Sequence, residues 1–298
     1  MREGFIGVLA RGIGGLPVLR ALQETLPFEP LWYVADQEHF PTSAHEEQAV
    51  VEWAAGLTRF LIERGAKLVV VASHVASALA LEALRTRFPG VPIVGVEPAL
   101  RPALLATQSG VVGVLAPETM LHSTRYQHMV RRYSRCLRIL SASCPGLVEQ
   151  VEAGVVDGPE VEAILERAVQ PMLEQRVDTF VLGCSHYSFV APVLRKRIGA
   201  RGVVVDSAPR VAQQVEHALR KTGRVRFAPG FRRGTRYFTT GDPKGFARKV
   251  TRLLGLALPP VVVPLMWDLQ GSRVHRRRGL DRRPIPAWRP QDVSPAAV

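Results

Sequence analysis

Short apolar runs alternate along this chain with longer segments in which apolar residues recur at helical spacing. The runs predicted to be buried strands are residues 5–10, 31–34, 68–72, 93–96, 111–116, 180–183 and 203–205. Helical spacing is found at residues 16–25, 46–64, 76–87 and 159–175. Nearly continuous Val, Leu and Ile content is typical of parallel strands covered on both faces. The pattern therefore predicts an α/β fold with functional side chains at the C-terminal ends of strands.

The chain also has an internal similarity. GVLA at residues 7–10 recurs at residues 113–116, and VVVASH at residues 69–74 has a counterpart in FVLGCSH at residues 180–186. The two pairs come in the same order and at similar spacing. This repeat predicts two similar α/β halves with parallel-rich sheets that face a shared cleft.

Composition narrows the class of protein. The 298 residues are enough for two domains, and no apolar run reaches the roughly 20 residues that span a bilayer. The first residues lack the apolar stretch of a signal peptide, so a cytoplasmic location is expected. The cysteines Cys136, Cys144 and Cys184 are odd in number and irregularly spaced, which argues against a disulfide framework and a structural zinc.

The net charge of +13 admits nucleic acid, an anionic membrane surface or an acidic substrate as partner. The basic residues are spread widely, and no helix-turn-helix, zinc finger or aromatic RNA-binding signature accompanies them. We therefore interpret them as an arginine-rich solvated surface, and we expect neither nucleic acid nor a membrane as partner. Residues 259–264 read as a linker or edge segment, and from about Gly271 an Arg- and Pro-rich composition predicts a disordered or loosely docked tail.

One motif resembles a known family. LGCSHY at residues 182–187 resembles the LGCTHY signature of glutamate racemases, with Ser185 in place of Thr. Further stretches agree in the same order, namely GIGGL at 12–16, PIVGVEP at 92–98, Ser123 and Tyr126, CP at 144–145, VE at 151–152, DS at 206–207 and FTT at 238–240. The resemblance covers roughly residues 4–256 and omits the tail.

The resemblance implies two α/β domains with the active site between them. The first would comprise residues 1–97 and 207–265, the second residues 98–206, and residues 266–298 would form the tail. The implied activity is the racemisation of glutamate, without cofactor or metal, by two cysteines on opposite faces of the α-carbon. A thiol suits this chemistry because its pKa of about 8.5 makes both protonation states accessible. A role in peptidoglycan biosynthesis, a small amino acid or dicarboxylate as ligand, and a homodimer are further expectations.

The departures from the family fall on one side of the expected site. Ser73 stands where the family has its first cysteine, and Ala10-Arg11 replaces an Asp-Ser pair that includes the helper of that cysteine. The family's carboxylate-binding Pro-Tyr-Gly loop corresponds to residues 41–43, which read PTS. The second cysteine is kept, and the residues that match its helpers are kept with it.

These matches define the candidate site. The candidate catalytic residues are Cys184, His186, Glu152 and Ser73. The candidate substrate-binding residues are Arg11, Pro41, Thr42, Ser43, His74, Val75 and Ser185. An unactivated serine hydroxyl is a weak base, whereas His74, with an ordinary pKa near 6.5, is a candidate acid or base. A purely structural role for Ser73 and His74 is the alternative.

Three functions fit this pattern. The first is a glutamate racemase-like isomerase with weak or altered activity. The second is a one-cysteine, decarboxylase-like enzyme of the same superfamily, which needs only the side of the site that holds Cys184. The third is a non-catalytic binding or regulatory homologue that keeps the cleft. Intact Cys184, His186 and Glu152 favour the first two, and the altered opposite side favours the last two.

Overall fold

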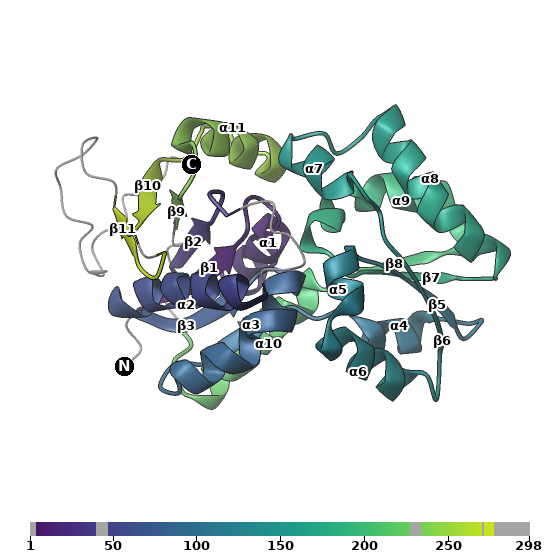
Figure 1. The fold of residues 1–298 in the computed structure, drawn as a ribbon, viewed down its shortest axis with the longest axis horizontal. Coiled ribbons are helices and arrows are strands. Elements are labelled where there is room, and N and C mark those ends of the chain that lie inside the picture. Colours follow the sequence, from purple (N-terminus) through teal and green to yellow (C-terminus); the bar gives the residue numbers. More distant parts are fainter. Residues whose placement is uncertain (1–3, 40–46, 227–233, 270, 277–298) are drawn as a thin grey trace.

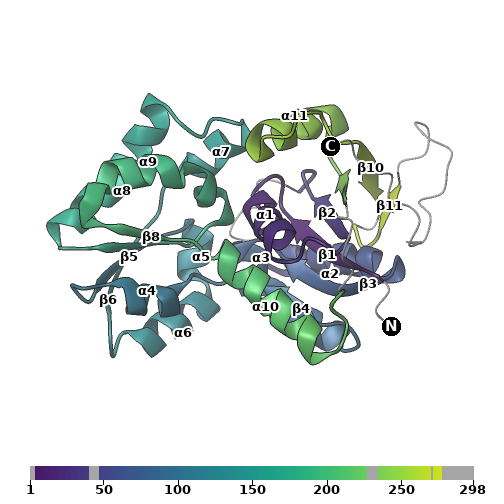
Figure 2. The same cartoon turned by 180° about the vertical axis from the view of Figure 1, so that it is seen from behind.

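The computed structural model describes residues 4–39, 47–226, 234–269 and 271–276, which form two β-sheets covered by helices (Figures 1 and 2). We call the part built on the seven-stranded sheet (residues 4–95 and 208–276) the large lobe, and the part built on the four-stranded sheet (residues 100–205) the small lobe. The predicted α/β class with parallel-rich sheets is confirmed. The exact domain boundaries stay a prediction.

The strands of the large lobe are β1 (Phe5–Ala10), β2 (Leu31–Ala35), β3 (Ala66–Val71), β4 (Ile93–Gly95), β9 (Thr235–Thr239), β10 (Val262–Trp267) and β11 (Val274–Arg276). Their order is β11-β10-β9-β2-β1-β3-β4, and only β10 and β11 are antiparallel. The small lobe has β5 (Val111–Leu115), β6 (Arg138–Ala142), β7 (Thr179–Leu182) and β8 (Val203–Val205), all parallel in the order β6-β5-β7-β8.

Helices cover both sheets. The large lobe has α1 (Leu16–Thr25), α2 (Glu47–Glu63), α3 (His74–Arg87), α10 (Ala208–Lys221) and α11 (Pro243–Leu254). The small lobe has α4 (Leu100–Ala106), α5 (Glu118–His122), α6 (Thr124–Tyr133), α7 (Leu147–Glu152), α8 (Pro159–Glu174), α9 (Ala191–Ile198) and the 3-10 helices η1 (Ser185–Val190) and η2 (Gly199–Arg201). No helix in the described part of the chain is both long and apolar enough to cross a membrane.

The alternation of side chains along β1 shows why this strand is apolar throughout. Ile6 and Val8 belong to a core cluster with α1, α10 and α11, whereas Phe5 and Leu9 belong to a cluster with α2 and α3 on the other face. The first cluster continues into the small lobe, where it includes Phe180. This first cluster therefore runs through both lobes, and its burial is worth about 25 cal/mol for each Å² of apolar surface removed from water.

The expected tail begins later than the sequence indicated. Trp267 and Val274 are buried, and β11 pairs with β10 at the edge of the large sheet. The Trp267 ring packs against Gly56 of α2, and its Nε1 donates a hydrogen bond to Asp36 Oδ1 at 3.1 Å. The expectation of a tail from residue 266 was wrong for residues 266–269 and 271–276, because strand pairing and the burial of Trp267 and Val274 fix this segment. Residues 277–298, with Trp288, lie outside the described residues.

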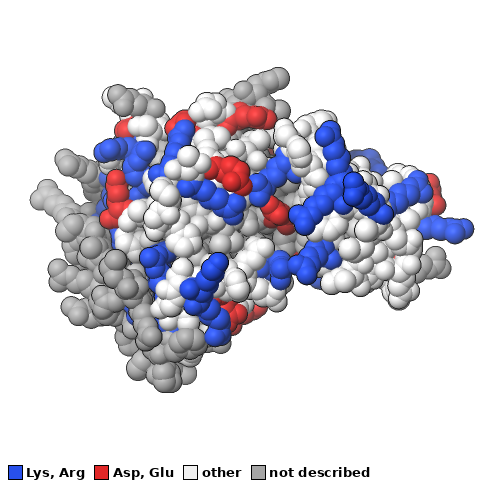
Figure 3. Space-filling view, turned by 90° about the horizontal axis from the view of Figure 1, so that it is seen from below, with Lys and Arg blue, Asp and Glu red and all other residues white. Residues whose placement is uncertain are grey.

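On the face shown in Figure 3, the basic side chains do not gather in one patch. Figure 3 shows Lys and Arg side chains over both lobes of the face seen from below, with acidic side chains among them. Several arginines pair with carboxylates, as Arg125 does with Glu97 and Glu82. This distribution agrees with a solvated surface, since exposed pairs of this kind contribute little to stability.

A buried ion pair gives a test of the large lobe. Lys67 Nζ lies 2.6 Å from Glu29 Oε2 and donates to the backbone oxygen of Arg224 at 2.8 Å, and burial lowers the pKa of Lys67. Replacing Lys67 by Met leaves a buried carboxylate without its cation, so we expect a loss of about 3 to 5 kcal/mol in unfolding free energy. Urea unfolding measures this loss.

Arg87→Met is the matched control, because it removes a cation from the half-exposed pair with Glu52. A loss below about 1 kcal/mol is expected there. Equal losses in the two variants would show that the pair at Lys67 has no special weight.

Candidate active site

Three kept residues form a buried hydrogen-bonded chain at the carboxyl end of β7. Cys184 follows this strand directly and precedes η1, which carries His186. The Sγ atom lies 3.8 Å from His186 Nδ1, and His186 Nε2 lies 2.8 Å from Glu152 Oε1 at the end of α7. Each of the three residues is less than 9% exposed. The structure therefore brings together a thiol, an imidazole and a carboxylate that are 34 residues apart at most in sequence.

The surroundings of His186, the middle residue of the chain, keep its imidazole protonated. Burial alone would lower the pKa of His186, but hydrogen bonds to Cys184 and Glu152 outweigh it and raise this pKa to about 9. Near neutral pH the ring therefore holds protons on both nitrogens, and it donates to the sulfur on one side and to the carboxylate on the other. The ring therefore places a charged N–H donor beside the sulfur of Cys184.

The glycine loop between β1 and α1 closes over this chain. The backbone N–H of Ile13 donates to Glu152 Oε1 at 2.9 Å. A Cβ at Gly12 would lie 2.0 Å from that same oxygen, and a Cβ at Gly14 would lie 2.3 Å from the His186 ring. Only glycine permits such a close approach. A loop of the large lobe therefore covers the Cys184–His186–Glu152 chain, which belongs to the small lobe.

Tyr33 holds this loop in place. It is not among the residues that the sequence predicted for the site. Its hydroxyl donates to the backbone oxygen of Gly12 at 2.9 Å and accepts from the N–H of Gly15 at 3.1 Å. Burial, and then the charge of Glu152, raise its pKa well above the ordinary value, so it stays a neutral donor. Its only signal in the sequence was a phenol within an otherwise apolar strand.

The opposite side of the site lies at the carboxyl end of β3. Parallel pairing sets Leu9 of β1 against Val71 of β3, so the segments that follow the two strands lie at one edge of the sheet. Ser73 is the N-cap of α3, and its Oγ accepts from the N–H of Ala76 at 3.3 Å. Ser73, Ala10 and Arg11 line one small hollow. Ser73 thus caps the first turn of α3, and its expected catalytic role stays a prediction.

His74 is buried at the first position of α3. Its Nε2 lies 3.3 Å from Ser207 Oγ, which in turn donates to the backbone oxygen of Glu97 at 2.8 Å. Burial, and then the nearby His186 imidazole, lower the pKa of His74 to about 3. His74 is therefore neutral near physiological pH, in contrast to His186. Ser207 had been matched to the family but not placed in the site.

A second cysteine lies close to the first. Cys144 follows β6 and is buried, and burial followed by the neighbouring Cys184 raises its pKa to about 12. The hydroxyl of Tyr187 hydrogen-bonds to it. Cys144 is therefore a thiol near neutral pH.

The remaining candidates are less informative. Ser185 is buried in η1, and Val75 is half-buried on α3 beside His74. Residues 41–43, with Pro41, Thr42 and Ser43, lie outside the described residues. Among the residues that the structure describes, no group of three or more His, Cys, Asp or Glu is placed to hold a metal ion.

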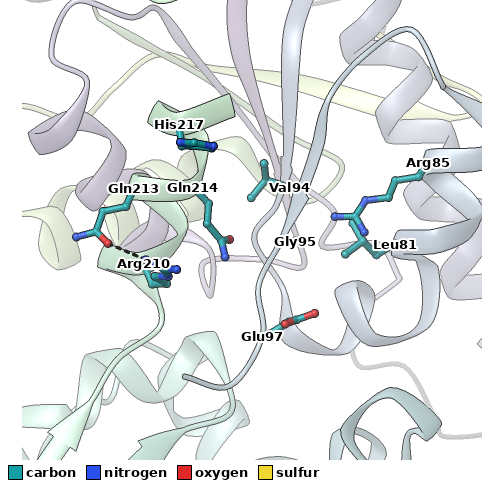
Figure 4. Close-up of a pocket in the computed structure, with 9 residues that line it drawn as sticks. All are labelled: Leu81, Arg85, Val94, Gly95, Glu97, Arg210, Gln213, Gln214 and His217. Atoms are coloured by element: carbon teal, nitrogen blue, oxygen red, sulfur yellow. Dashed lines mark hydrogen bonds between the residues drawn. The ribbon is translucent and has the colours of Figure 1, made fainter. Parts of the chain in front are cut away.

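A separate groove of about 710 Å³ lies between α3, β4 and α10 (Figure 4). It is lined by Leu81, Arg85, Val94, Gly95, Glu97, Arg210, Gln213, Gln214 and His217. None of the candidate residues lines it, and a hydrogen bond from Arg210 to Gln213 occupies part of its wall. We therefore assign the chemistry to the buried chain of Cys184 and not to this groove.

Comparison with known proteins identifies relatives over most of the chain. The sequence pattern of the family described as Asp/Glu/Hydantoin racemase matches residues 17–215. A glutamate racemase from Roseiflexus sp. (strain RS-1) is 42% identical over 248 residues, which are 83% of this chain and 91% of the relative.

Solved structures agree with the sequence relatives. A glutamate racemase isoform from Bacillus anthracis has a TM-score of 0.80 at 28% identity, covering 90% of this chain and 99% of its own. The Escherichia coli glutamate racemase, in complex with L-glutamate and the activator UDP-MurNAc-Ala, has a TM-score of 0.72 at 27% identity and covers 85% and 95%.

The fold and these likenesses define an isomerase of the racemase type. The chain belongs to the Asp/Glu/Hydantoin racemase family. The relatives confirm a racemase-type isomerase, the class named in the first of the three functions, and they do not favour a decarboxylase-like or non-catalytic homologue. That its activity is weak or altered stays a prediction.

Proposed function

We propose that this enzyme racemises glutamate without a cofactor, as a step in peptidoglycan biosynthesis. The observation that supports the proposal most is the buried chain from Cys184 through His186 to Glu152. The relatives named glutamate racemase, and the Escherichia coli structure that holds L-glutamate, support the choice of substrate. A cytoplasmic location and a homodimer remain predictions.

Cys184 would act on one face of the α-carbon. As a thiolate it would remove the α-proton, and as a thiol it would deliver a proton to the planar intermediate. His186 would stabilise the thiolate through its Nδ1–H. Glu152 would hold the imidazole in place and maintain its charge, because a carboxylate stabilises a buried imidazolium.

On the face of the α-carbon opposite Cys184, the catalytic groups of the family are replaced by weaker ones. The Ser73 hydroxyl is engaged as a helix cap, and Ala10 supplies no carboxylate to activate it. A hydroxyl without an adjacent base stays protonated near neutral pH. We therefore propose an activity that is lower than that of a racemase with two cysteines.

Incubation with L- or D-glutamate in deuterated water tests the proposal. NMR should show deuterium entering the α-position, and circular dichroism should show inversion. Cys184→Ala should lower inversion, and exchange from the enantiomer whose α-proton faces Cys184, by at least about a hundredfold, because it removes the group that touches that proton. Cys136→Ala changes an exposed thiol and is the matched control, with full activity expected. No exchange from either enantiomer by the parent protein would refute the assignment of glutamate as substrate.

A further inference from the structure

His74 lies where the two lobes meet. Its helix belongs to the large lobe, its Nε2 faces Ser207 on the chain segment returning from the small lobe, and His186 of the small lobe is close enough to affect its pKa. The side chain of His74 is 3% exposed. An imidazole in this position is enclosed by the same elements that enclose the site.

The hydrogen bonds fix which nitrogen of His74 holds the proton. Ser207 Oγ–H donates to the backbone oxygen of Glu97, so this hydroxyl has no second proton to give. It must therefore accept from His74, which puts the only proton of the neutral ring on Nε2. The lone pair of Nδ1 is consequently bare.

The lone pair on His74 Nδ1 is buried and accepts no hydrogen bond from the part of the chain that the structure describes. Among the described residues, Nδ1 of His74 has no hydrogen-bond partner. A buried nitrogen that lacks a partner costs about 1 to 3 kcal/mol, and such atoms are rare outside sites where a ligand completes them. The Ser73 hydroxyl next to it is already engaged with Ala76. Of the two adjacent candidates, only His74 offers a basic nitrogen without a partner, because an unactivated hydroxyl is a much weaker base than a neutral imidazole.

The groups on the two sides of the junction between the lobes differ in protonation. The pair of Cys184 and His186 holds a proton that it can deliver through sulfur, whereas Nδ1 of His74 holds none. Racemisation needs this asymmetry, because one group must accept a proton while another donates one on the opposite face.

We propose that His74, through Nδ1, is the acid and base on the face of the α-carbon opposite Cys184, in place of the absent first cysteine. The inference rests on the proposed racemisation of glutamate. In one direction the α-C–H bond breaks and an N–H bond forms at Nδ1, with the electron pair left on the planar intermediate. The S–H bond of Cys184 then breaks as a new C–H bond forms on the other face, which leaves Cys184 as a thiolate beside His186.

The reverse direction starts from the imidazolium of His74 and the thiolate of Cys184. A substrate with two carboxylates favours that imidazolium, because nearby negative charge stabilises a cation in a buried site. Ser207 keeps the ring oriented in both directions, since it accepts from Nε2–H in either protonation state. His74 is thus a catalytic residue and Ser207 a positioning residue.

The test compares His74→Asn and Ser73→Ala in the full chain, with L- and D-glutamate in deuterated water. His74→Asn should lower inversion by at least about a hundredfold in both directions. It should retain deuterium exchange from the one enantiomer whose α-proton faces Cys184. Ser73→Ala should change inversion by less than about threefold, because the hydroxyl only caps a helix. His74→Gln and thermal unfolding guard against a folding defect in the asparagine variant.

A rescue completes the design. Adding Ser73→Cys and Ala10→Asp to His74→Asn should restore inversion at least about tenfold, since it supplies a thiol and its carboxylate on the same face. Inversion that survives both His74→Asn and His74→Gln would overturn the role of His74 and leave the proposed racemisation intact. Absence of exchange in the parent protein would instead overturn the proposed function, and the role of His74 with it.

Discussion

Replacing Glu152 by Gln is expected to lower α-proton exchange from the enantiomer whose proton faces Cys184 by at least about a hundredfold. The amide occupies the same space but has no charge, so the pKa of His186 should fall from about 9 toward its ordinary value. The imidazolium that supports the Cys184 thiolate is then lost near neutral pH. Exchange rates in deuterated water and NMR titration of the His186 ring measure the two effects together.

Glu149→Gln is the control, because it removes the same charge from an exposed position on the same helix. It should leave the titration of His186 and the exchange rate nearly unchanged. A Glu152→Gln variant with the parent's exchange rate would show that the carboxylate has no part in the chemistry.

The same pair gives the stability of the protein a dependence on pH. The pKa of His186 is raised from 6.5 to about 9 in the folded state, so its contribution is complete below pH 6.5 and is lost as the pH rises through 9. The full effect is on the order of 3 kcal/mol. The pKa of His74 is lowered to about 3, so its contribution is present above pH 6.5 and is lost as the pH falls toward 3. Urea unfolding between pH 6.5 and 9 isolates the first effect, and Glu152→Gln should flatten it.

A methyl group on the glycine loop should be nearly as damaging as the loss of the carboxylate. In Gly12→Ala the new Cβ would meet Glu152 Oε1 at 2.0 Å, so the loop or the carboxylate has to move. Either movement breaks the hydrogen bond from Ile13 and exposes His186 to water. We expect inversion to fall by at least about a hundredfold, as measured from both enantiomers.

Gly110→Ala separates this clash from backbone strain. Gly110 has a φ of +72°, close to the +74° of Gly12, but a Cβ there meets nothing within 4 Å. Both variants share the cost of a left-handed alanine, about 1 kcal/mol, and only Gly12→Ala has the clash. Similar activities in the two variants would mean that the loop yields freely and that its close packing is unimportant.

The sequence predicted much of the fold because buried parallel strands have a strong pattern. Residues 5–10 and 16–25 coincide with β1 and α1. The edge strand β6 was missed because Arg138 and Ser141 interrupt its apolar character, and one face of an edge strand is open to water. The start of the expected tail was misassigned because burial of Trp267 depends on Gly56, a residue that is distant in sequence.

The site shows the same division. A local motif identified Cys184 and His186, and a short match identified Glu152. No sequence pattern indicates that Tyr33 holds the glycine loop, or that Ser207 fixes the tautomer of His74. These contacts join segments that are far apart in the chain, and only the packing of the lobes creates them.

The hydrogen bond from Ser207 to Glu97 joins the two segments that cross between the lobes. Two chain segments joined at one point can act as a pivot. When one lobe rotates about it, atoms far from the pivot move more than atoms near it. An opening rotation of the lobes would therefore leave His74 and Ser207 almost stationary while it withdraws the glycine loop from Glu152. The contact that shields the imidazolium is the one that parts first, so access for a ligand and the loss of charge at His186 would be a single mechanical event.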